Sequence, residues 1–272
     1  MASSVIIQVG AATVQTVVTF GEFCRFCGRT LAWTVAAVRL RYLRLLMEQM
    51  FDVGTRSVPV VMITGAFVGM VLAAQSVLQF QSVGLEAKLG AIVNLSVVRE
   101  LGPVLTGVVL AGRVGGALAA VLGTMRVTEQ IDALRAMGSD PIRVLVVPRF
   151  LACAFLLPVL ALYADLMGIL GGYAIGVWIY HINAAAFWQN AAQAVKLFDI
   201  VSGLLKSFFF GAVVSLICCY RGFTCRPGAA GVGRACTESF VESVMTILAL
   251  DFFLGVILNT VYKIFWGKVQ VL

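Results

Sequence analysis

The sequence has 272 residues, of which 61% are hydrophobic and only 12% are charged. A soluble protein of this length could not cover its surface with so few charges, and the apolar runs do not alternate in polarity as membrane β-barrel strands do. The net charge of +7 fits the Lys and Arg excess of cytoplasmic loops, and no basic block interleaved with aromatic residues predicts a nucleic-acid partner. We therefore expect an all-α polytopic membrane protein.

Residues 1–55 form a predicted N-terminal interfacial or cytoplasmic helical segment, ahead of a transmembrane domain at 56–272. Near its end, polar and apolar side chains fall on two faces of one helix, as in a helix lying in the membrane interface. A plain cytoplasmic helix is the alternative. The polar face holds Thr34, Arg41, Arg44 and Glu48, and the apolar face holds Leu40, Leu43, Met47 and Met50.

Cys24 and Cys27 form a C-x-x-C pair within this segment. No second pair and no nearby histidine complete a zinc site, so we predict no metal site, while a redox role stays open. His181 is interpreted as a residue at the end of a loop, because no second histidine, serine–histidine pair or carboxylate cluster accompanies it. We therefore expect no catalytic residue.

Five apolar runs are predicted to cross the membrane. The first contains Gly65 and Gly69 in a G-x-x-x-G pattern that permits close helix contact. The third exceeds a bilayer core of about 30 Å, so it must tilt, bend at Pro158 or project beyond the membrane. The spans are expected at about 58–80, 92–122, 144–180, 200–220 and 244–265, with loops at 181–199 and 221–243.

Arginines gather in alternate connections between these spans, which predicts the orientation of the chain. Residues before the first span, between the second and third spans, and between the fourth and fifth spans carry most of them. With five spans, this distribution places the N-terminus in the cytoplasm and the C-terminus in the periplasm of a bacterial inner membrane. The arginines concerned are Arg25, Arg29, Arg39, Arg41, Arg44, Arg126, Arg135, Arg143, Arg149, Arg221, Arg226 and Arg234.

The stretch GTMRVTEQIDALRAMGSDP, residues 123–141, is a polar segment between two apolar runs. Gly138 is predicted to follow the end of a short helix, and Asp140 with Pro141 to stop it. At about ten residues the helix is too short to be stable alone, so it needs a membrane or protein surface. A simple interfacial loop helix is the alternative. Its apolar stripe, spaced i, i+4, i+7 and i+10, is Val127, Ile131, Leu134 and Met137.

Three charged residues lie within the second predicted span: Arg99, Glu100 and Arg113. An isolated charge at the bilayer centre costs at least about 2.5–3.5 kcal/mol, so such residues face a cavity or a partner. With a kink expected from Pro103, we interpret Arg99 and Glu100 as lining a cavity that admits a polar headgroup. A structural ion pair is the alternative, for example Arg113 with Asp165 or Asp251. Candidate contacts with acyl chains on the first span are Val68, Val71, Leu72, Val77 and Leu78.

The runs RELGPVLTGVVLAGRVGGALAA and LGTMRVTEQIDALRAMGSDPIRVLVVPRFLA closely resemble the MlaE-type permease family, the membrane subunits of Mla/Mce ATP-binding-cassette phospholipid transporters. PGAAGVGRACT at 227–237 and LALDFFLG at 248–255 are also similar to this family. Val121 and Ala230 depart from it, since the family usually has Glu at the first position and commonly has Glu at the second. The resemblance covers about residues 50–265.

This resemblance implies an interfacial helix, five transmembrane helices and a cytoplasmic coupling helix between the second and third, which seats in a groove of a cytoplasmic ATPase. It also implies that Arg99 and Glu100 lie near bound lipid. The residues that it assigns to ATPase coupling are Met125, Arg126, Glu129, Gln130, Asp132, Leu134 and Met137.

No G-x-x-x-x-G-K-[ST] phosphate loop is present, so we expect this chain to bind no cofactor and a partner to hold ATP and Mg. Five spans are few for a transport path, which favours a homodimer with a shared lipid cavity. The expected function is a permease subunit, not an enzyme, moving phospholipids or related lipids between the inner membrane and a periplasmic carrier. The expected partners are an ABC ATPase dimer, a periplasmic Mce-domain protein and a small cytoplasmic STAS-type protein. An ATPase-independent lipid transporter or channel and a membrane-embedded lipid enzyme are the alternatives.

Overall fold

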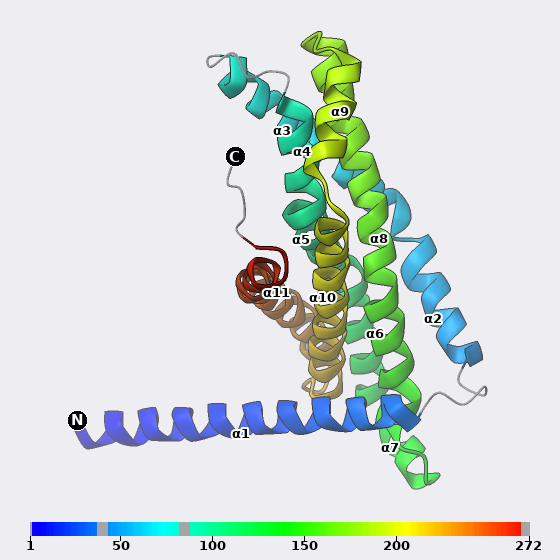
Figure 1. Ribbon diagram of the computed structural model, residues 1–272. Coiled ribbons are helices and arrows are strands. Elements are labelled where there is room, and N and C mark those ends of the chain that lie inside the picture. Colours follow the sequence, from blue (N-terminus) through cyan, green and yellow to red (C-terminus); the bar gives the residue numbers. More distant parts are fainter. Residues whose placement is uncertain (1, 37–42, 82–87, 268–272) are drawn as a thin grey trace.

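A computed structural model describes residues 2–36, 43–81 and 88–267, and the other residues lie outside the description. Within these ranges the chain is helical apart from short turns and contains no strand. The predicted all-α membrane class is therefore confirmed. Figure 1 shows a long bundle crossed at one end by the N-terminal helix α1 (Ala2–Ala36).

Among the described residues, five helical segments are long and apolar enough to cross a membrane, which agrees with the number of predicted spans. They have 27 to 39 residues each, more than the roughly 20 that a bilayer core needs, so they must tilt or extend beyond it. The first comprises α2 (Leu43–Thr55) and α3 (Val58–Gln81); the second comprises α4 (Leu89–Ser96), η3 (Val97–Leu101), α5 (Gly102–Leu110), η4 (Ala111–Gly115) and α6 (Gly116–Val127); the third comprises η5 (Ile142–Val146), α8 (Val147–Tyr173) and η6 (Ala174–Ile179); the fourth is α10 (Leu197–Phe223) and the fifth is α11 (Ala229–Trp266).

The second span contains two π-helical turns, η3 and η4. Proline has no N–H, so Pro103 would leave the carbonyl four residues before it without its α-helical donor. A π-turn lies just upstream of Pro103, and in it the Gly102 N–H donates to the Val97 carbonyl. The irregularity expected around Pro103 takes the form of an added residue in the helix.

Close contact between α3 and α8 forms the largest helix pairing in the bundle. A Cβ atom on Gly65 or Gly69 would overlap the backbone of Ala164 or Gly168 on α8. The predicted role of the G-x-x-x-G pattern is confirmed, because only glycine lets these backbones approach so closely. The helix α8 continues through Pro158.

The N-terminal helix α1 lies across the bundle end at which α7 (Gln130–Ala136) is found (Figure 1). It packs against η5, α8 and α10. Phe26 anchors it, with its ring edge-on to Tyr220 at a centroid distance of 5.6 Å. An interfacial position for the N-terminal segment stays a prediction. The two faces predicted between Thr34 and Met50, however, fall on α1 and α2, and their Leu40 and Arg41 lie outside the described residues.

Two predicted loops contain helix. Residues 181–199 include α9 (Ala184–Ala194), whose first N–H groups are capped by the Asn183 side chain. The prediction of a glycine-rich loop at 221–243 is wrong, because α11 begins at Ala229 and only residues 224–228 separate it from α10. Gly228, with φ of 92°, makes the turn, and a pair of Arg234 with Glu238 one turn apart supports the helix that follows.

Candidate functional site

Charged residues of the second span meet side chains from two other spans inside the bundle. Lys206 of α10, which is 1% exposed, donates to Glu100 Oε2 at 2.5 Å and to Asp251 Oδ1 at 2.9 Å. Glu100 lies on η3 and Asp251 on α11, so one ammonium joins the second, fourth and fifth spans. A buried ammonium requires such partners, because desolvating an unpaired charge is costly.

Arg99 takes different partners from its neighbour Glu100. Its guanidinium donates to Asn259 Oδ1 on α11 and lies 3.9 Å from Asp199 Oδ1 at the start of α10. Asp199 also accepts a hydrogen bond at 3.0 Å from the Lys196 N–H and so helps to cap α10. The Arg99 and Glu100 side chains keep 29% and 43% of their surface exposed. We call the whole set the charge cluster: Arg99, Glu100, Asp199, Lys206, Asp251 and Asn259.

The structure gives Arg113 a partner other than the two suggested from sequence. Its Nη1 donates to Ser57 Oγ in the turn between α2 and α3, because η4 carries Arg113 to the part of the bundle where that turn lies. Asp251 pairs with Lys206, while buried Asp165 Oδ1 accepts no hydrogen bond from the described residues. Arg113 therefore joins the second span to the first.

Three of the five predicted acyl-chain contacts on α3, Val68, Leu72 and Leu78, have different surroundings in the single chain. Val68 lines a space of about 10 Å³ among α3, α5 and α8, which has room for about one water molecule. Leu72 packs against a cluster that includes Val93 and Phe187, and Leu78 is 63% exposed. Their contact with acyl chains stays a prediction.

Sequence reasoning missed Lys206, Asp199 and Asn259 as members of the charge cluster. Lys206 gave a usable signal, since it lies within the apolar run predicted at 200–220, where any ionisable residue suggests a functional site. Asp199 and Asn259 gave none, because they lie near the ends of their spans and meet Arg99 only in the folded chain.

The coupling segment, residues 125–141, ends as predicted. The Gly138 N–H donates to the Arg135 carbonyl at 2.9 Å, and the Ser139 N–H donates to the Leu134 carbonyl at 3.0 Å. Gly138 has a φ of 75°, which completes a Schellman motif and confirms its place just after the helix. This motif fixes the direction in which the chain leaves α7.

The predicted continuous apolar stripe is wrong. Glu129 takes the left-handed conformation with φ of 58°, so α6 ends at Val127 and the seven-residue helix α7 begins at Gln130. The chain must change direction at the end of the second span, and the left-handed conformation of Glu129 makes this turn. Of the stripe, Ile131 is fully buried, whereas Met137 is 73% exposed.

Asp132 holds this corner together. Its Oδ2 accepts from Arg126 Nη1 at 2.6 Å and its Oδ1 accepts from Arg135 Nη1 at 2.8 Å, so α7 is tied to the end of α6. Gln130 Nε2 donates to Thr128 Oγ1 at 3.0 Å. Of the predicted coupling residues, Met125, Arg126 and Leu134 are half-buried, and Glu129, Gln130, Asp132 and Met137 are exposed.

The N-terminal helix contacts the same segment. Trp33 Nε1 donates to Asp140 Oδ2 at 2.8 Å, and Asp140 Oδ1 accepts from the Ile142 N–H at 2.9 Å. The Arg143 guanidinium lies over the Trp33 ring, 4.9 Å from its centroid. These contacts join α1 to the turn between α7 and the third span.

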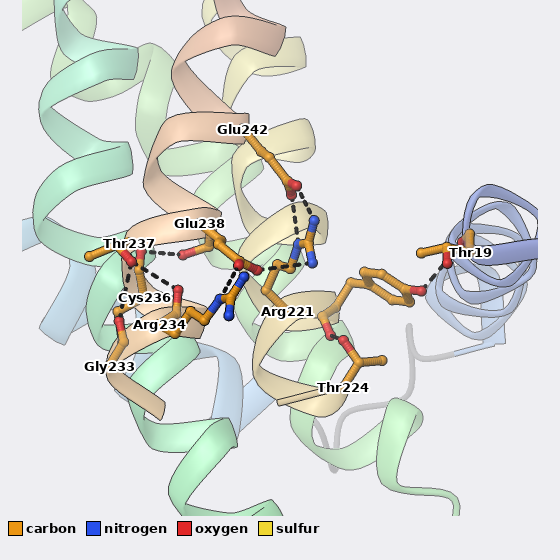
Figure 2. A network of polar contacts seen from close by, with 11 residues as sticks. Thr19, Arg221, Thr224, Gly233, Arg234, Cys236, Thr237, Glu238 and Glu242 are labelled. Carbon is orange, nitrogen blue, oxygen red and sulfur yellow. Dashed lines mark hydrogen bonds and ion pairs between the residues drawn. The ribbon is translucent and has the colours of Figure 1, made fainter. Parts of the chain in front are cut away.

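A second ionic network joins α10 to α11 at this end of the bundle, and Figure 2 shows it. Arg221 Nε donates to Glu242 Oε2 at 2.7 Å, and its Nη2 donates to the other carboxylate oxygen, a two-pronged contact. Arg221 Nη1 also lies 3.2 Å from Glu238, which accepts from Arg234 at 2.7 Å. The network fixes how the fifth span leaves the fourth.

Burial of Cys27 bears on the C-x-x-C pair. It raises the pKa of the Cys27 thiol to about 11, with a smaller contribution from Cys24. The thiolate, which is the reactive form, is then about one part in ten thousand at pH 7. Nucleophilic redox chemistry at Cys27 is therefore disfavoured at neutral pH.

Comparison with known proteins places this arrangement in a family. The sequence profile described as Permease MlaE matches residues 46–257. The chain belongs to the MlaE permease family. As a member of the MlaE family with five apolar helices, it is a multi-pass inner-membrane protein. The match begins at residue 46, so it includes most of α2.

Three relatives show how widely this MlaE-family sequence is shared. A probable ABC transporter permease protein of Rickettsia conorii is 41% identical over 245 residues, covering 90% of this chain and 94% of the relative. The intermembrane phospholipid transport system permease protein MlaE of Haemophilus influenzae is 36% identical over 219 residues, covering 80% and 84%. Protein TRIGALACTOSYLDIACYLGLYCEROL 1, chloroplastic, of Arabidopsis thaliana is 40% identical over 209 residues, covering 77% of this chain and 60% of that protein.

The two departures from the MlaE-type pattern lie on the outside of the single chain. Val121 on α6 is 47% exposed, and Ala230 in the first turn of α11 is also exposed. Neither side chain is packed into the core of this chain. The substitutions therefore change an outer surface and leave the packing of the bundle intact.

Proposed function

We propose that this chain is the permease subunit of an ATP-binding-cassette transporter that moves phospholipids or related lipids between the inner membrane and a periplasmic carrier. ATP and Mg are bound by a cytoplasmic ATPase dimer, an Mce-domain protein receives or supplies the lipid, and a small STAS-type protein joins the ATPase side. The names of the Rickettsia and Haemophilus relatives support this proposal.

The proposed function rests on the physical connection between α7 and the charge cluster. One unbroken helical segment leads from η3, which holds Arg99 and Glu100, through η4 to α6. Asp132 locks α7 to the end of that segment. A partner that moves α7 therefore moves the helix carrying the charged residues, so energy from ATP hydrolysis has a direct mechanical route into the membrane.

The charge cluster suits a lipid headgroup. Arg99 keeps part of its guanidinium exposed, and a guanidinium binds phosphate oxygens through paired N–H donors. The buried Lys206 ammonium binds the carboxylates of Glu100 and Asp251. These contacts fix the orientation of the cluster's partly exposed side chains. Changes in the α10–α11 packing would alter these contacts and with them the affinity for the headgroup.

We propose that the lipid cavity forms between two copies of this chain in a homodimer. Only 6% of the apolar window of α11 is buried in the single chain, against 56% for the third span. The exposed side chains of α11 form a continuous apolar face, and a twofold pairing along it would bring two charge clusters to a shared interior. This face comprises Phe240, Val241, Met245, Leu248, Phe252, Phe253, Val256 and Ile257.

The docking role of α7 is tested by copurification with the ATPase. Asp132→Lys reverses an exposed charge and breaks both arginine contacts, so we expect at least tenfold less ATPase to copurify. Leu134→Asp should act likewise by placing a charge on the apolar side of α7. Asp52→Lys, which changes an exposed aspartate on α2, is the matched control. Wild-type recovery of ATPase with Asp132→Lys and Leu134→Asp would contradict the coupling role.

The lipid site is tested separately, by mass spectrometry of lipid retained in the purified permease. Arg99→Ala and Glu100→Ala should both lower lipid occupancy, while Lys263→Ala, an exposed residue on α11, should not. Unchanged lipid recovery would leave both residues with a structural role alone. Uphill lipid movement by a reconstituted chain without any ATPase would instead favour the secondary transporter.

A further inference from the structure

A hollow of about 260 Å³ lies between α1 and the turn that follows α7. We call it the α1 pocket. Its walls come from α1, the α7–η5 turn and the end of α10, so it is separate from the charge cluster within the spans. Its polar lining is Glu22, Arg25, Arg29, Arg135, Asp140 and Thr224, and its apolar lining is Phe26, Pro141, Ile142, Tyr220 and Phe223.

The free charge in the α1 pocket is positive. Arg25 and Arg29 lie one turn apart on α1, are exposed, and make no hydrogen bond or ion pair with any residue that the structure describes. Asp140 has both carboxylate oxygens engaged, by Trp33 and by the Ile142 N–H, and Arg135 is held by Asp132. Two guanidiniums with unused donors therefore face one unengaged carboxylate, that of Glu22, among the described residues.

The floor of the α1 pocket is aromatic. Phe26 is 9% exposed and packs edge-on to Tyr220 and, at 5.8 Å between centroids, against Phe223. A cationic rim above an apolar floor fits a ligand with an anionic head and an apolar body. A small soluble anion would use the rim but leave the floor without a partner.

The place of the pocket favours a lipid. The α1 helix crosses the bundle end, roughly perpendicular to the spans (Figure 1), at the level where headgroups meet water. Basic pockets among membrane helices at this level bind anionic headgroups. We propose that the α1 pocket binds an anionic phospholipid such as phosphatidylglycerol, with Arg25 and Arg29 donating to its phosphate.

This lipid is distinct from the transported one, and its binding needs neither ATPase nor transport. It has a structural consequence for the coupling segment. Trp33 already ties α1 to Asp140, and a bound headgroup would add a second bridge from α1 to the turn beside Arg135. Anionic lipid would thereby hold the coupling segment against α1.

The test uses the intact chain in detergent, titrated with phosphatidylglycerol, phosphatidylcholine or inorganic phosphate. Native mass spectrometry counts bound lipid, and thermal unfolding reports stabilisation. Phosphatidylglycerol should bind and raise the unfolding temperature more than phosphatidylcholine, and phosphate alone should not. Because each arginine near an anionic surface contributes about fivefold, Arg25→Gln with Arg29→Gln should weaken phosphatidylglycerol binding about 25-fold.

A matched variant separates the pocket from general charge attraction. Arg226→Gln with Arg234→Gln removes the same charge from the α10–α11 corner, outside the α1 pocket, and should leave phosphatidylglycerol binding within about twofold of the unmodified chain. Equal losses in the two double variants, equal binding of phosphatidylcholine, or stabilisation by phosphate alone would each overturn the proposal. Loss of ATPase copurification with unchanged lipid binding would assign the arginines to the protein partner and overturn it too.

Discussion

At the scale of single residues, Lys206 is the centre on which the charge cluster depends. Its ammonium is buried and contacts carboxylates from two other helices. We predict that Lys206→Met lowers the free energy of unfolding by about 3–5 kcal/mol, because Glu100 and Asp251 lose their shared counter-charge. Thermal or denaturant unfolding of the purified permease measures the loss.

A compensated variant distinguishes lost charge pairing from lost packing. Adding Glu100→Gln and Asp251→Asn to Lys206→Met removes the stranded carboxylates and should restore most of the stability. If the single variant unfolds like the unmodified protein, the ion pairs contribute nothing measurable. If the triple variant is no better than the single one, packing by the lysine stem accounts for the effect.

Cys27 gives a prediction on pH. Since burial raises its pKa to about 11, the thiolate fraction, and with it the alkylation rate, should rise about 100-fold between pH 7 and pH 9 and keep rising to about pH 11. The measurement uses iodoacetamide on a chain whose other cysteines are replaced by alanine. In denaturant the rate should level off near pH 9, as for a free cysteine with a pKa of about 8.5. A plateau below pH 10 in the folded chain contradicts the burial of this thiol.

At the scale of the helix, the α3–α8 contact provides the sharpest comparison. A methyl group at Gly69 would overlap the backbone of Gly168, whereas one at Gly116 meets nothing within 4 Å. We predict that Gly69→Ala costs about 1–3 kcal/mol of stability through overpacking, while Gly116→Ala changes it little. Unfolding curves of the two variants decide the matter, and equal curves would mean that α3 shifts away freely.

The helices could be predicted where a local sequence pattern determines them. The length of the apolar runs predicted the five spans, and Gly138, Asp140 and Pro141 predicted where α7 ends. The left-handed Glu129 was not predictable, because a non-glycine residue adopts this conformation only where the surrounding chain requires it. The start of α11 was missed because glycines at 231 and 233 suggest a loop, while the Arg234–Glu238 pair and packing on α10 favour helix.

At the scale of the whole molecule, the site depends on contacts between distant parts of the chain. Lys206 lies 106 residues from Glu100, and Asn259 lies 160 residues from Arg99. The sequence pointed to Arg99 and Glu100 because charge within an apolar run is exceptional. It could not supply their partners, because the rotation of α10 and α11 about their axes is set by packing among several helices.

The proposed dimer face leads to a cross-linking prediction. In a cysteine-free background, Phe252→Cys places a thiol on the exposed face of α11, and oxidation should give covalent dimers in membranes. Leu166→Cys, another exposed apolar position, on α8, should remain monomeric. Dimers through α8 and none through α11, resolved on non-reducing gels, would reverse the assignment.

The two π-helical turns also bear on how this chain tolerates insertions and deletions. Each turn holds one residue more than an α-helix would place there, so losing a residue within either turn would return the backbone to α-helical winding and keep the later part of the span in phase. The helix α6 has no such extra residue. Losing a residue there would rotate the part of the helix on one side of the deletion by about 100° relative to the other part. The second span therefore has two places where its length can change while the faces presented to its neighbours stay the same.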